Sequence, residues 1–148
     1  MKVRPAQAED FDVVVALLEE LGRARVTDET ADAVRALYER HLEDENAAHL
    51  VAEDEGRVIA FCSLHFRDRL NHPTPDAWIP DLIVTESARR RGAARALLQE
   101  AERVASERGC WQLTLESGYA RRLAHRLYAS DGMTDAGKYF TKSLPPPS

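Results

Sequence analysis

The chain has 148 residues, with 20 lysine and arginine residues against 25 aspartate and glutamate residues, a net charge of −5 and 44% hydrophobic residues. A chain of this length normally forms one domain whose core is large enough to fold without a metal or a disulfide. No apolar run approaches the roughly 20 residues that span a bilayer, and no signal-peptide core follows the first residues. We therefore expect neither a membrane protein nor a secreted one. Cys62 and Cys110 lie in apolar surroundings, which fits reduced core thiols in a cytoplasmic protein.

Charge is unevenly divided along the chain. Residues 1–60 carry 7 basic and 15 acidic side chains, whereas residues 61–148 carry 13 basic and 10 acidic ones. The basic side chains are concentrated in an arginine-rich segment within residues 89–103. This pattern indicates a local anionic ligand, because binding of extended nucleic acid usually needs a basic balance over the whole domain. No aromatic residues for base stacking are interleaved with the arginines, so we expect no nucleic-acid partner.

Two amphipathic helices are predicted in the first third of the chain. The first should begin near Ala8 and end at Gly22. The second should be capped by Thr27 or Asp28. The two apolar faces, at spacings of three and four, are Phe11, Val14, Leu17, Leu18 and Leu21, and Val34, Leu37, Tyr38 and Leu42.

Strand patterns come before and after these helices. Residues 2–5 are expected to form a short edge strand. Residues 49–52 and 58–62 flank an acidic segment with a glycine, which predicts an antiparallel hairpin. Residues 67–75 are expected to form a loop.

The middle of the chain predicts a parallel β-α-β unit. Residues 78–84 are mostly apolar, as in a central strand buried on both faces. Pro80 has no N–H donor, so a bulge or an unpaired edge is expected there. A strongly amphipathic helix over residues 92–108 is followed by a strand over residues 111–115, and strands joined by such a crossover run parallel.

The rest of the chain predicts a helix over residues 120–130 and a closing strand over residues 138–144. Residues 1–144 are therefore expected to form a single domain, and residues 145–148 a disordered proline-rich tail. The predicted fold class is mixed α/β, with antiparallel strands first, a parallel pair in the middle and flanking helices.

The segment between the central strand and the long helix resembles an anion-binding turn. Unpaired N–H groups at a helix N-terminus bind anionic oxygen, and Gly92 has no Cβ to keep a pyrophosphate away. Neighbouring arginines can add charge-assisted hydrogen bonds. The segment contains neither the Walker pattern of nucleotide-binding loops nor the Gly-x-Gly-x-x-Gly dinucleotide pattern.

Two motifs in this part of the chain resemble those of the GNAT superfamily of N-acetyltransferases. Arg89-x-x-Gly92-x-Ala94 is similar to the acyl-CoA loop of that superfamily, whose pattern is Arg-x-x-Gly-x-Gly/Ala. Residues 121–133, with the pattern Arg-x-x-Ala-His-x-Leu-Tyr-x-x-x-Gly-Met, resemble a second conserved segment, in which Met133 replaces the usual Phe. The resemblance covers nearly the whole chain, and the second half is most similar to small-molecule acetyltransferases of the aminoalkylphosphonate type.

The resemblance implies a GNAT-like mixed sheet in which the central parallel strands splay apart and admit the pantetheine arm of acetyl-CoA as an added strand. Here those strands would be residues 78–84 and 111–116. Acetyl-CoA would then be the co-substrate and a small-molecule amine the acceptor. The residues expected to bind the co-substrate are Leu82, Ile83, Val84, Arg89, Arg90, Arg91, Gly92, Ala93, Ala94, Arg95 and Tyr128.

Two side chains are candidates for the proton transfers that aminolysis of a thioester requires. Tyr128 matches the superfamily tyrosine whose hydroxyl points at the CoA sulfur, where it can protonate the departing thiolate; the alternative is an ordinary buried tyrosine. Asp81 lies one step before the expected gap and is the candidate general base. Its alternative is a solvated or ion-paired carboxylate. His125 is better explained by a structural or capping role.

The acceptor site is predicted less sharply. Glu116 and Tyr119 follow the second parallel strand and either line the acceptor pocket or lie on the surface. Polar residues before the central strand are candidates for an anionic acceptor group, although loops often carry such residues without function: His65, Arg67, Arg69 and His72. His65 and His72 do not form a convincing ligand pattern, so no metal is expected.

The primary hypothesis is an enzyme that transfers an acetyl group to a primary amine by direct attack in a ternary complex. Neither cysteine has the base of a nucleophile arrangement, which disfavours a covalent acetyl-enzyme. The rival is an acyl-CoA-binding sensor or interaction module without turnover, which Pro80 favours. The superfamily also makes a homodimer a reasonable expectation.

Overall fold

The computed structural model describes residues 1–116, 122–137 and 139–147. The chain divides into two compact units, Met1–Leu115 and Glu116–Ser148. Among the described helices, none has both the length and the apolar character that a membrane crossing requires. The elements of the first unit are β1 (Lys2–Pro5), a 3-10 turn (Ala8–Asp10), α1 (Phe11–Leu21), α2 (Ala31–Glu43), β2 (Leu50–Asp54), β3 (Arg57–Cys62), β4 (His65–Arg67), β5 (Asp76–Ile79), β6 (Leu82–Val84), a second 3-10 turn (Glu86–Ala88), α3 (Ala93–Glu107) and β7 (Gln112–Leu115).

The strands of the first unit form two sheets. One has the order β1-β2-β3-β6 and is antiparallel throughout; the other has the order β4-β5-β7. In the second sheet β5 pairs with β7 in parallel, from Asp76 opposite Gln112 to Ile79 opposite Leu115. The predicted edge strand, the hairpin and the parallel β-α-β unit are therefore confirmed.

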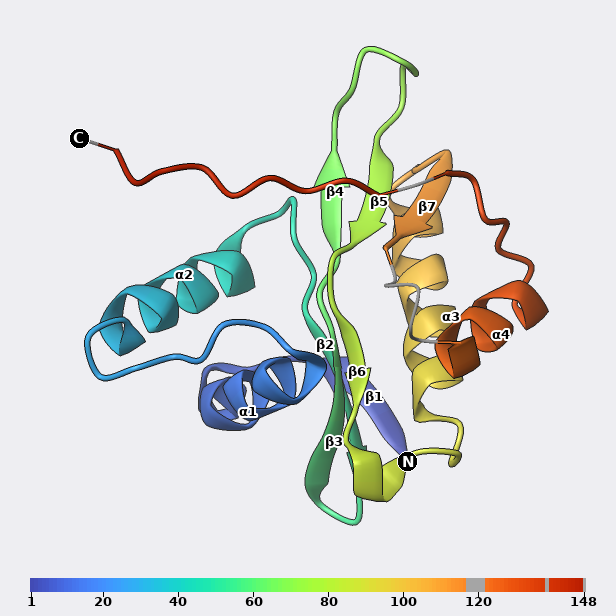
Figure 1. The fold of residues 1–148 in the computed structure, drawn as a ribbon. Helices are drawn as coiled ribbons and strands as arrows, with labels where there is room; N and C mark the ends of the chain where they lie inside the picture. The colour runs from blue at the N-terminus through green and yellow to red at the C-terminus, as the bar shows by residue number, and fades with distance from the viewer. Residues whose placement is uncertain (117–121, 138, 148) are drawn as a thin grey trace. The chain divides into compact units, whose positions relative to one another are not determined.

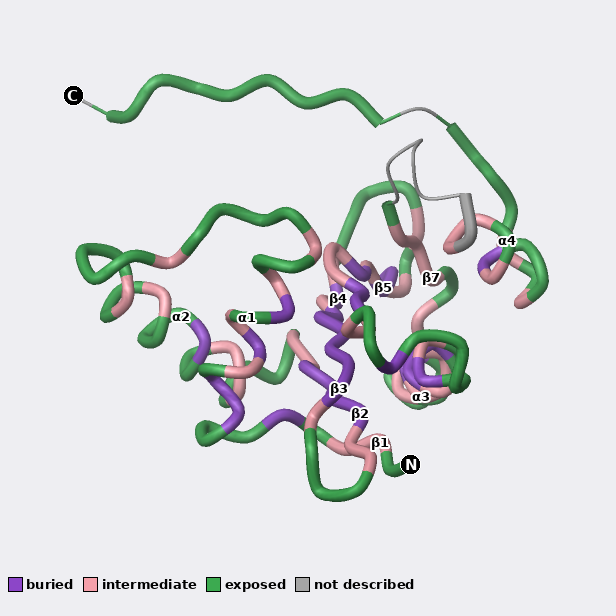
Figure 2. Tube along the Cα trace, turned by 60° about the horizontal axis from the view of Figure 1, so that its bottom comes forward, coloured by how far each residue is buried: buried purple, intermediate pink, exposed green. Residues whose placement is uncertain are grey.

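Helices cover both faces of the four-stranded sheet (Figure 1). On one side α1 packs on β3 and β6, with α2 beside it, and on the other side α3 packs across β1, β2, β3 and β6. The core beneath α1 and α2 is the cluster Ala6, Phe11, Val14, Leu17, Tyr38, Val51, Phe61 and Ile83. Figure 2 shows buried residues concentrated along β2 and β3, as expected of strands covered on both faces. At about 25 cal/mol per Å² of apolar area, this burial is the main stabilising contribution.

The hairpin between β2 and β3 turns on two residues in the left-handed region. Glu55 has φ 50° and Gly56 has φ 76°. Two such residues form the type I′ turn whose twist matches that of the flanking strands. The turn places Asp54, the last residue of β2, next to the arginine-rich segment described below.

The loop expected over residues 67–75 is found at residues 68–75, where it joins β4 to β5, and Arg67 is the last residue of β4, opposite Asp76. The structure corrects two other sequence predictions in the first unit. The cap of α2 lies at Thr30, because Thr27 instead closes the preceding turn by accepting the Thr30 N–H. Leu37 is exposed rather than part of the apolar face.

The second unit contains one described helix, α4 (Arg122–Ser130). It ends in a left-handed Gly132 (φ 86°), with the Met133 N–H donating to the Tyr128 carbonyl at 3.0 Å. This is a glycine C-cap, so the Gly-Met pair of the second motif terminates the helix. The predicted closing strand is wrong for residues 139–144, which are extended but pair with no described strand, and Lys138 lies outside the described residues.

Candidate functional site

The predicted central strand is broken at Pro80 and Asp81 into β5 and β6, which belong to different sheets. Pro80 donates no hydrogen bond, and the Asp81 N–H turns to the hydroxyl of Ser63 at 3.0 Å. The expected irregularity at Pro80 is confirmed. Beyond the break β6 pairs only with β3 among the described strands, while β5 pairs with β7. The two halves of the strand therefore follow different neighbours, and β6 keeps one edge without a strand partner in the described chain.

A short basic turn connects β6 to α3. Arg89 donates from Nε to the carbonyl of Val84 at 3.2 Å, which folds the turn back on the end of β6. Arg90 and Gly92 have φ values of 68° and 83°. A non-glycine residue with positive φ is uncommon and costs about 1–3 kcal/mol. The turn therefore has a backbone conformation that most sequences would avoid.

The turn delivers backbone amides to the start of α3. The first intrahelical hydrogen bond runs from the Ala96 N–H to the Gly92 carbonyl at 3.0 Å. The amides of Gly92, Ala93 and Ala94 precede that bond, at the positive end of the helix dipole. A Cβ at Gly92 would meet no protein atom within 4 Å, so the glycine is required by its φ and not by crowding within the protein.

Two arginines of this turn make only loose ion pairs with the acidic first part of the chain. Arg89 Nη2 lies 3.9 Å from Glu20 Oε1, and Arg91 Nη1 lies 3.5 Å from Asp54 Oδ2. Both guanidinium side chains are more than half exposed. Pairs of this kind contribute little to stability, so the arginines can exchange partners for an anionic ligand at small cost. Amides, positive φ and exposed guanidinium groups together fit a diphosphate.

The Asp81 carboxylate lies at the start of β6 and is held by two side chains. Arg23 donates from Nε to Oδ1 at 2.7 Å, and Ser63 donates from its hydroxyl to Oδ2 at 3.0 Å. Arg23 also donates to the Pro80 carbonyl at 2.8 Å, so it bridges the break in the strand. Sequence reasoning missed Arg23, because it lies 58 positions away and follows a helix end with no motif.

The arginines proposed for an anionic acceptor are engaged elsewhere. Arg67 makes two hydrogen bonds to Asp76, at 2.9 and 3.0 Å, and Arg69 lies 3.5 Å from the same carboxylate. Asp76 is 1% exposed, so this pairing neutralises a buried charge. His72 stacks on Trp111 at 4.7 Å and does not approach His65. The four residues therefore do not form one group.

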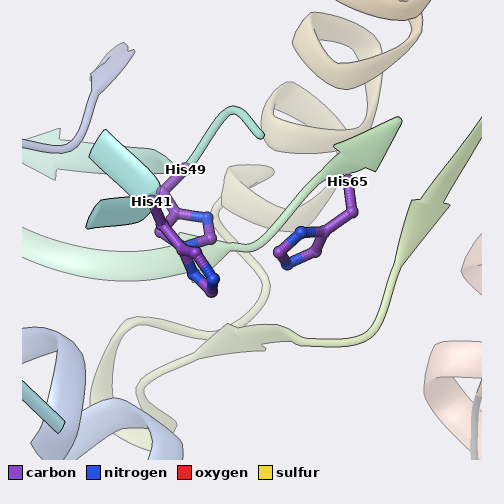
Figure 3. Close-up of side chains that lie close together, drawn as sticks. All are labelled: His41, His49 and His65. Carbon is purple, nitrogen blue, oxygen red and sulfur yellow. The ribbon is translucent and has the colours of Figure 1, made fainter. Parts of the chain in front are cut away.

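His65 instead belongs to a three-histidine cluster, which we define as His41, His49 and His65 (Figure 3). His41 is in the last turn of α2, His49 directly precedes β2 and His65 begins β4. Burial, followed by the nearby imidazoles, lowers the pKa of His49 to about 4 and also lowers the pKa of His65. No spacing in the sequence indicates this cluster, because its members come from three separate elements.

Comparison with known proteins shows the family of the chain. A model of the Acetyltransferase (GNAT) family matches residues 14–133. The chain belongs to the GNAT family of acetyltransferases. The match extends across both compact units and includes the basic turn, the break in the strand and the second motif. The GNAT resemblance and the expected mixed fold are thus confirmed: the protein is an acetyltransferase, and its co-substrate is acetyl-CoA.

Individual relatives agree with this assignment. The chain is 32% identical over 143 residues to an aminoalkylphosphonate N-acetyltransferase of Salmonella typhimurium, covering 97% of this chain and 91% of that protein. A putative acetyltransferase from Agrobacterium tumefaciens has a similar fold, with a TM-score of 0.84, 22% identity and coverage of 97% and 100%. An aminoglycoside N-acetyltransferase solved in complex with CoA has a TM-score of 0.79, 18% identity and coverage of 98% and 100%.

The remaining candidate site residues of this GNAT acetyltransferase follow the first unit in the sequence. Glu116 is exposed, directly after β7. Tyr119 and Arg121 lie outside the described residues. Tyr128 is on α4 in the second unit and is 8% exposed, and His125 lies one turn before it. The tyrosine therefore occupies the motif position on a helix, as the sequence predicts.

Neither cysteine of this acetyltransferase resembles an activated nucleophile. Cys62 is fully buried in β3, and burial raises the pKa of its thiol well above the usual range. Burial also raises the pKa of Cys110. A thiolate is the reactive form of cysteine, so both side chains are held in the inert form.

Proposed function

We propose that this protein transfers the acetyl group of acetyl-CoA to a primary amine of a small molecule, by direct attack in a ternary complex. The observation that carries the proposal is the basic turn, with its positive-φ backbone and exposed guanidinium groups, at the start of α3 in a chain of the acetyltransferase family. The relatives named above are an aminoalkylphosphonate and an aminoglycoside acetyltransferase, and both names denote small amines.

In this reaction the turn of residues 89–95 holds the diphosphate of CoA. The free edge of β6, from Leu82 to Val84, supplies backbone groups to the pantetheine arm and to the thioester carbonyl, whose developing negative charge they stabilise. The amine nitrogen attacks that carbonyl carbon, the C–N bond forms and the C–S bond breaks. One proton leaves the amine and one proton joins the CoA sulfur.

Asp81 and Tyr128 are the side chains proposed for these two protons. Asp81 accepts the proton of the amine, directly or through one water; its position directly before β6 supports this role. Tyr128 donates to the departing thiolate, a role supported by its place in the second motif. The inert state of both thiols supports direct attack, because a covalent acetyl-enzyme would need an activated cysteine.

The acceptor amine is proposed to lie beside the β5–β6 break. His65, Arg67, Glu116 and Tyr119 stay predictions for its pocket, and the pairing of Arg67 with Asp76 makes an indirect role the better supported one for that residue. A homodimer in the cytoplasm remains the expected form of the enzyme, and light scattering after gel filtration tests the dimer.

A non-catalytic acyl-CoA-binding module is the second candidate. The observation that favours it is that Arg23 and Ser63 engage both oxygens of the Asp81 carboxylate, which leaves the proposed base less available. Both candidates bind acetyl-CoA, but only the transferase turns it over.

Thiol release measured over a panel of aminoalkylphosphonates, aminoglycosides, amino acids and polyamines separates them, with thermal shift by acetyl-CoA on the same samples. We expect release with at least one amine class. Tyr128→Phe should lower kcat by about 10²–10⁴-fold with binding of CoA retained. The exposed Tyr139 gives the matched control Tyr139→Phe, which should change neither. Stabilisation without release from any amine would support the binding module, and unchanged release by Tyr128→Phe would remove that residue from the mechanism.

A further inference from the structure

The three-histidine cluster neither holds the co-substrate nor moves a proton in the proposed transfer, and its geometry points to a ligand of its own. One ring nitrogen of each residue lies within 4.8 Å of the other two. His41 Nδ1 and His49 Nε2 are 3.1 Å apart. Two imidazole nitrogens bound to one tetrahedral Zn²⁺ at 2.0–2.1 Å are about 3.4 Å apart. The first pair is therefore close to the spacing of metal ligands, and the His65 nitrogen lies within 4.8 Å of both.

The three rings of the cluster contact one another edge to face and are not stacked. The ring centroids lie 5.1 Å apart for His41 and His49, 5.1 Å for His41 and His65, and 5.6 Å for His49 and His65. The corresponding interplanar angles are 78°, 80° and 76°. The rings therefore meet edge to face, and no ring of the cluster is stacked on another member of it. Figure 3 shows the His65 ring facing the other two.

Hydrogen bonding within the protein leaves this cluster incomplete. His49 is 7% exposed, and its Nδ1, the ring nitrogen that does not contact His41, has no hydrogen-bond partner among the residues that the structure describes. An unsatisfied buried polar atom is unfavourable and is uncommon in native proteins. The contact between His41 and His49 pairs one N–H with one lone pair, so a cation that replaces it would be bound by the lone pairs of both nitrogens.

The surroundings favour a cation. The negative charge of Asp81 acts on both His49 and His65, and that of Asp44 acts on His65, against the positive charge of Arg67. Aromatic rings enclose the buried side, with Phe61 5.5 Å from His49 and Trp78 5.9 Å from His65. His41 and His65 are only partly buried, which leaves a path for an ion to enter.

We propose that His41, His49 and His65 bind one divalent transition-metal cation of the zinc class. Imidazole nitrogen is a favoured ligand for Zn²⁺, Ni²⁺ and Cu²⁺, whereas Mg²⁺ and Ca²⁺ prefer oxygen. Three protein ligands leave a fourth coordination position open, which takes water or a ligand from solution. The site does not rest on the transferase reaction, since none of its ligands holds the co-substrate or moves a proton in it.

The test is calorimetric titration of the chelator-treated full-length protein with Zn²⁺, together with the visible spectrum of its Co²⁺ form. We expect one Zn²⁺ per chain and the intense absorption of tetrahedral Co²⁺. His41→Gln and His65→Gln should each weaken Zn²⁺ binding by at least about 100-fold, since loss of a direct ligand exceeds the 10–100-fold typical of outer partners. His72→Gln, the same substitution at a histidine outside the cluster, should leave the affinity unchanged.

Three results would overturn the proposal: no saturable binding of Zn²⁺ by the unaltered chain, retained affinity in both cluster variants, or an equal loss in His72→Gln. Thermal shift by acetyl-CoA on each metal-free variant shows that the variant is folded. His41 and His65 are used because both are partly exposed, whereas replacing the buried His49 risks the fold. Acetyl-CoA binding without zinc binding would reject the metal site and leave the proposed transfer untouched.

Discussion

Replacing Arg91 by glutamine tests the basic turn most directly. In the folded protein its guanidinium group is 58% exposed and makes one loose ion pair, 3.5 Å from Asp54. Loss of such a surface pair costs about 0.2–1 kcal/mol of stability. A charge-assisted hydrogen bond to a phosphate oxygen is worth about 1.5–3 kcal/mol, which is about 10- to 150-fold in Kd. Arg91→Gln should therefore leave the protein stable and weaken CoA binding at least tenfold.

Asp54 makes the expected effect larger and supplies a second test. Without Arg91 its carboxylate keeps only the N-terminal amino group of Met1, at 3.8 Å, and it would repel a diphosphate bound at the turn. The double variant Arg91→Gln/Asp54→Asn should thus recover part of the affinity that Arg91→Gln loses. Comparing the CoA affinity of the double variant with the affinities of Arg91→Gln and Asp54→Asn measures the coupling between the two side chains.

The assay is calorimetric titration with CoA at fixed ionic strength, since exposed charges are screened by salt. Arg103→Gln is the matched control, because Arg103 is also an exposed arginine on α3 and pairs with Glu100 and Glu107 away from the turn. It should bind CoA as the unaltered chain does. A change of less than twofold for Arg91→Gln, or an equal loss for Arg103→Gln, would refute the assignment of the diphosphate to this turn.

Three further predictions concern stability. Gly92→Ala should lower the free energy of unfolding by about 1–2 kcal/mol because of its φ of 83°, whereas Gly137→Ala, without a positive φ, should not; urea unfolding compares them. Arg67→Met should cost about 3 kcal/mol in the same assay, because Asp76 stays buried with only Arg69 at 3.5 Å, and an equal effect of Arg69→Met would contradict this. Hydrogen bonds from Arg4 lower the pKa of Asp10, so their contribution is full above about pH 4 and is lost as the pH falls through the lower, folded pKa; Arg4→Gln should flatten the acid limb of a stability–pH curve.

The features that the sequence predicts correctly are those that depend on residues close together in the chain. The stripe of α3, the hairpin with Gly56, the parallel β-α-β unit and the irregularity at Pro80 all follow from periodicity, turn chemistry or a missing N–H donor. The basic turn was predictable for the same reason, since its arginines and Gly92 are consecutive in the sequence. The family motifs then placed these elements in one known fold.

Contacts between distant residues were not predictable in this way. Arg23 reaches Asp81 across 58 positions, and the three-histidine cluster gathers residues from α2, β2 and β4. The strand β4, His65–Arg67, was not predicted, because a segment of three residues is too short to show a strand pattern in the sequence. The apolar pattern after position 138 predicts a strand, yet the apolar side chains that the structure describes there are exposed. A high β-propensity does not produce strand pairing without a partner strand.

Glu20 shows how the acidic first part of the chain bears on the basic turn. Its carboxylate accepts from the Glu86 N–H at 2.7 Å and from the Thr85 hydroxyl at 3.0 Å, so α1 fixes the start of the turn while placing a negative charge 3.9 Å from Arg89. These two effects oppose each other in CoA binding, and two variants separate them. Glu20→Gln keeps both contacts, because its oxygen accepts from the amide and its NH₂ donates to the hydroxyl, but it removes the charge; CoA binding should tighten by about two- to fivefold.

Glu20→Ala removes the charge and the two contacts together. The turn then loses its attachment to α1, so CoA should bind more weakly than to the unaltered chain. Calorimetry with CoA compares the two variants. Equal affinities for Glu20→Gln and Glu20→Ala would mean that the charge alone matters and that α1 does not position the turn.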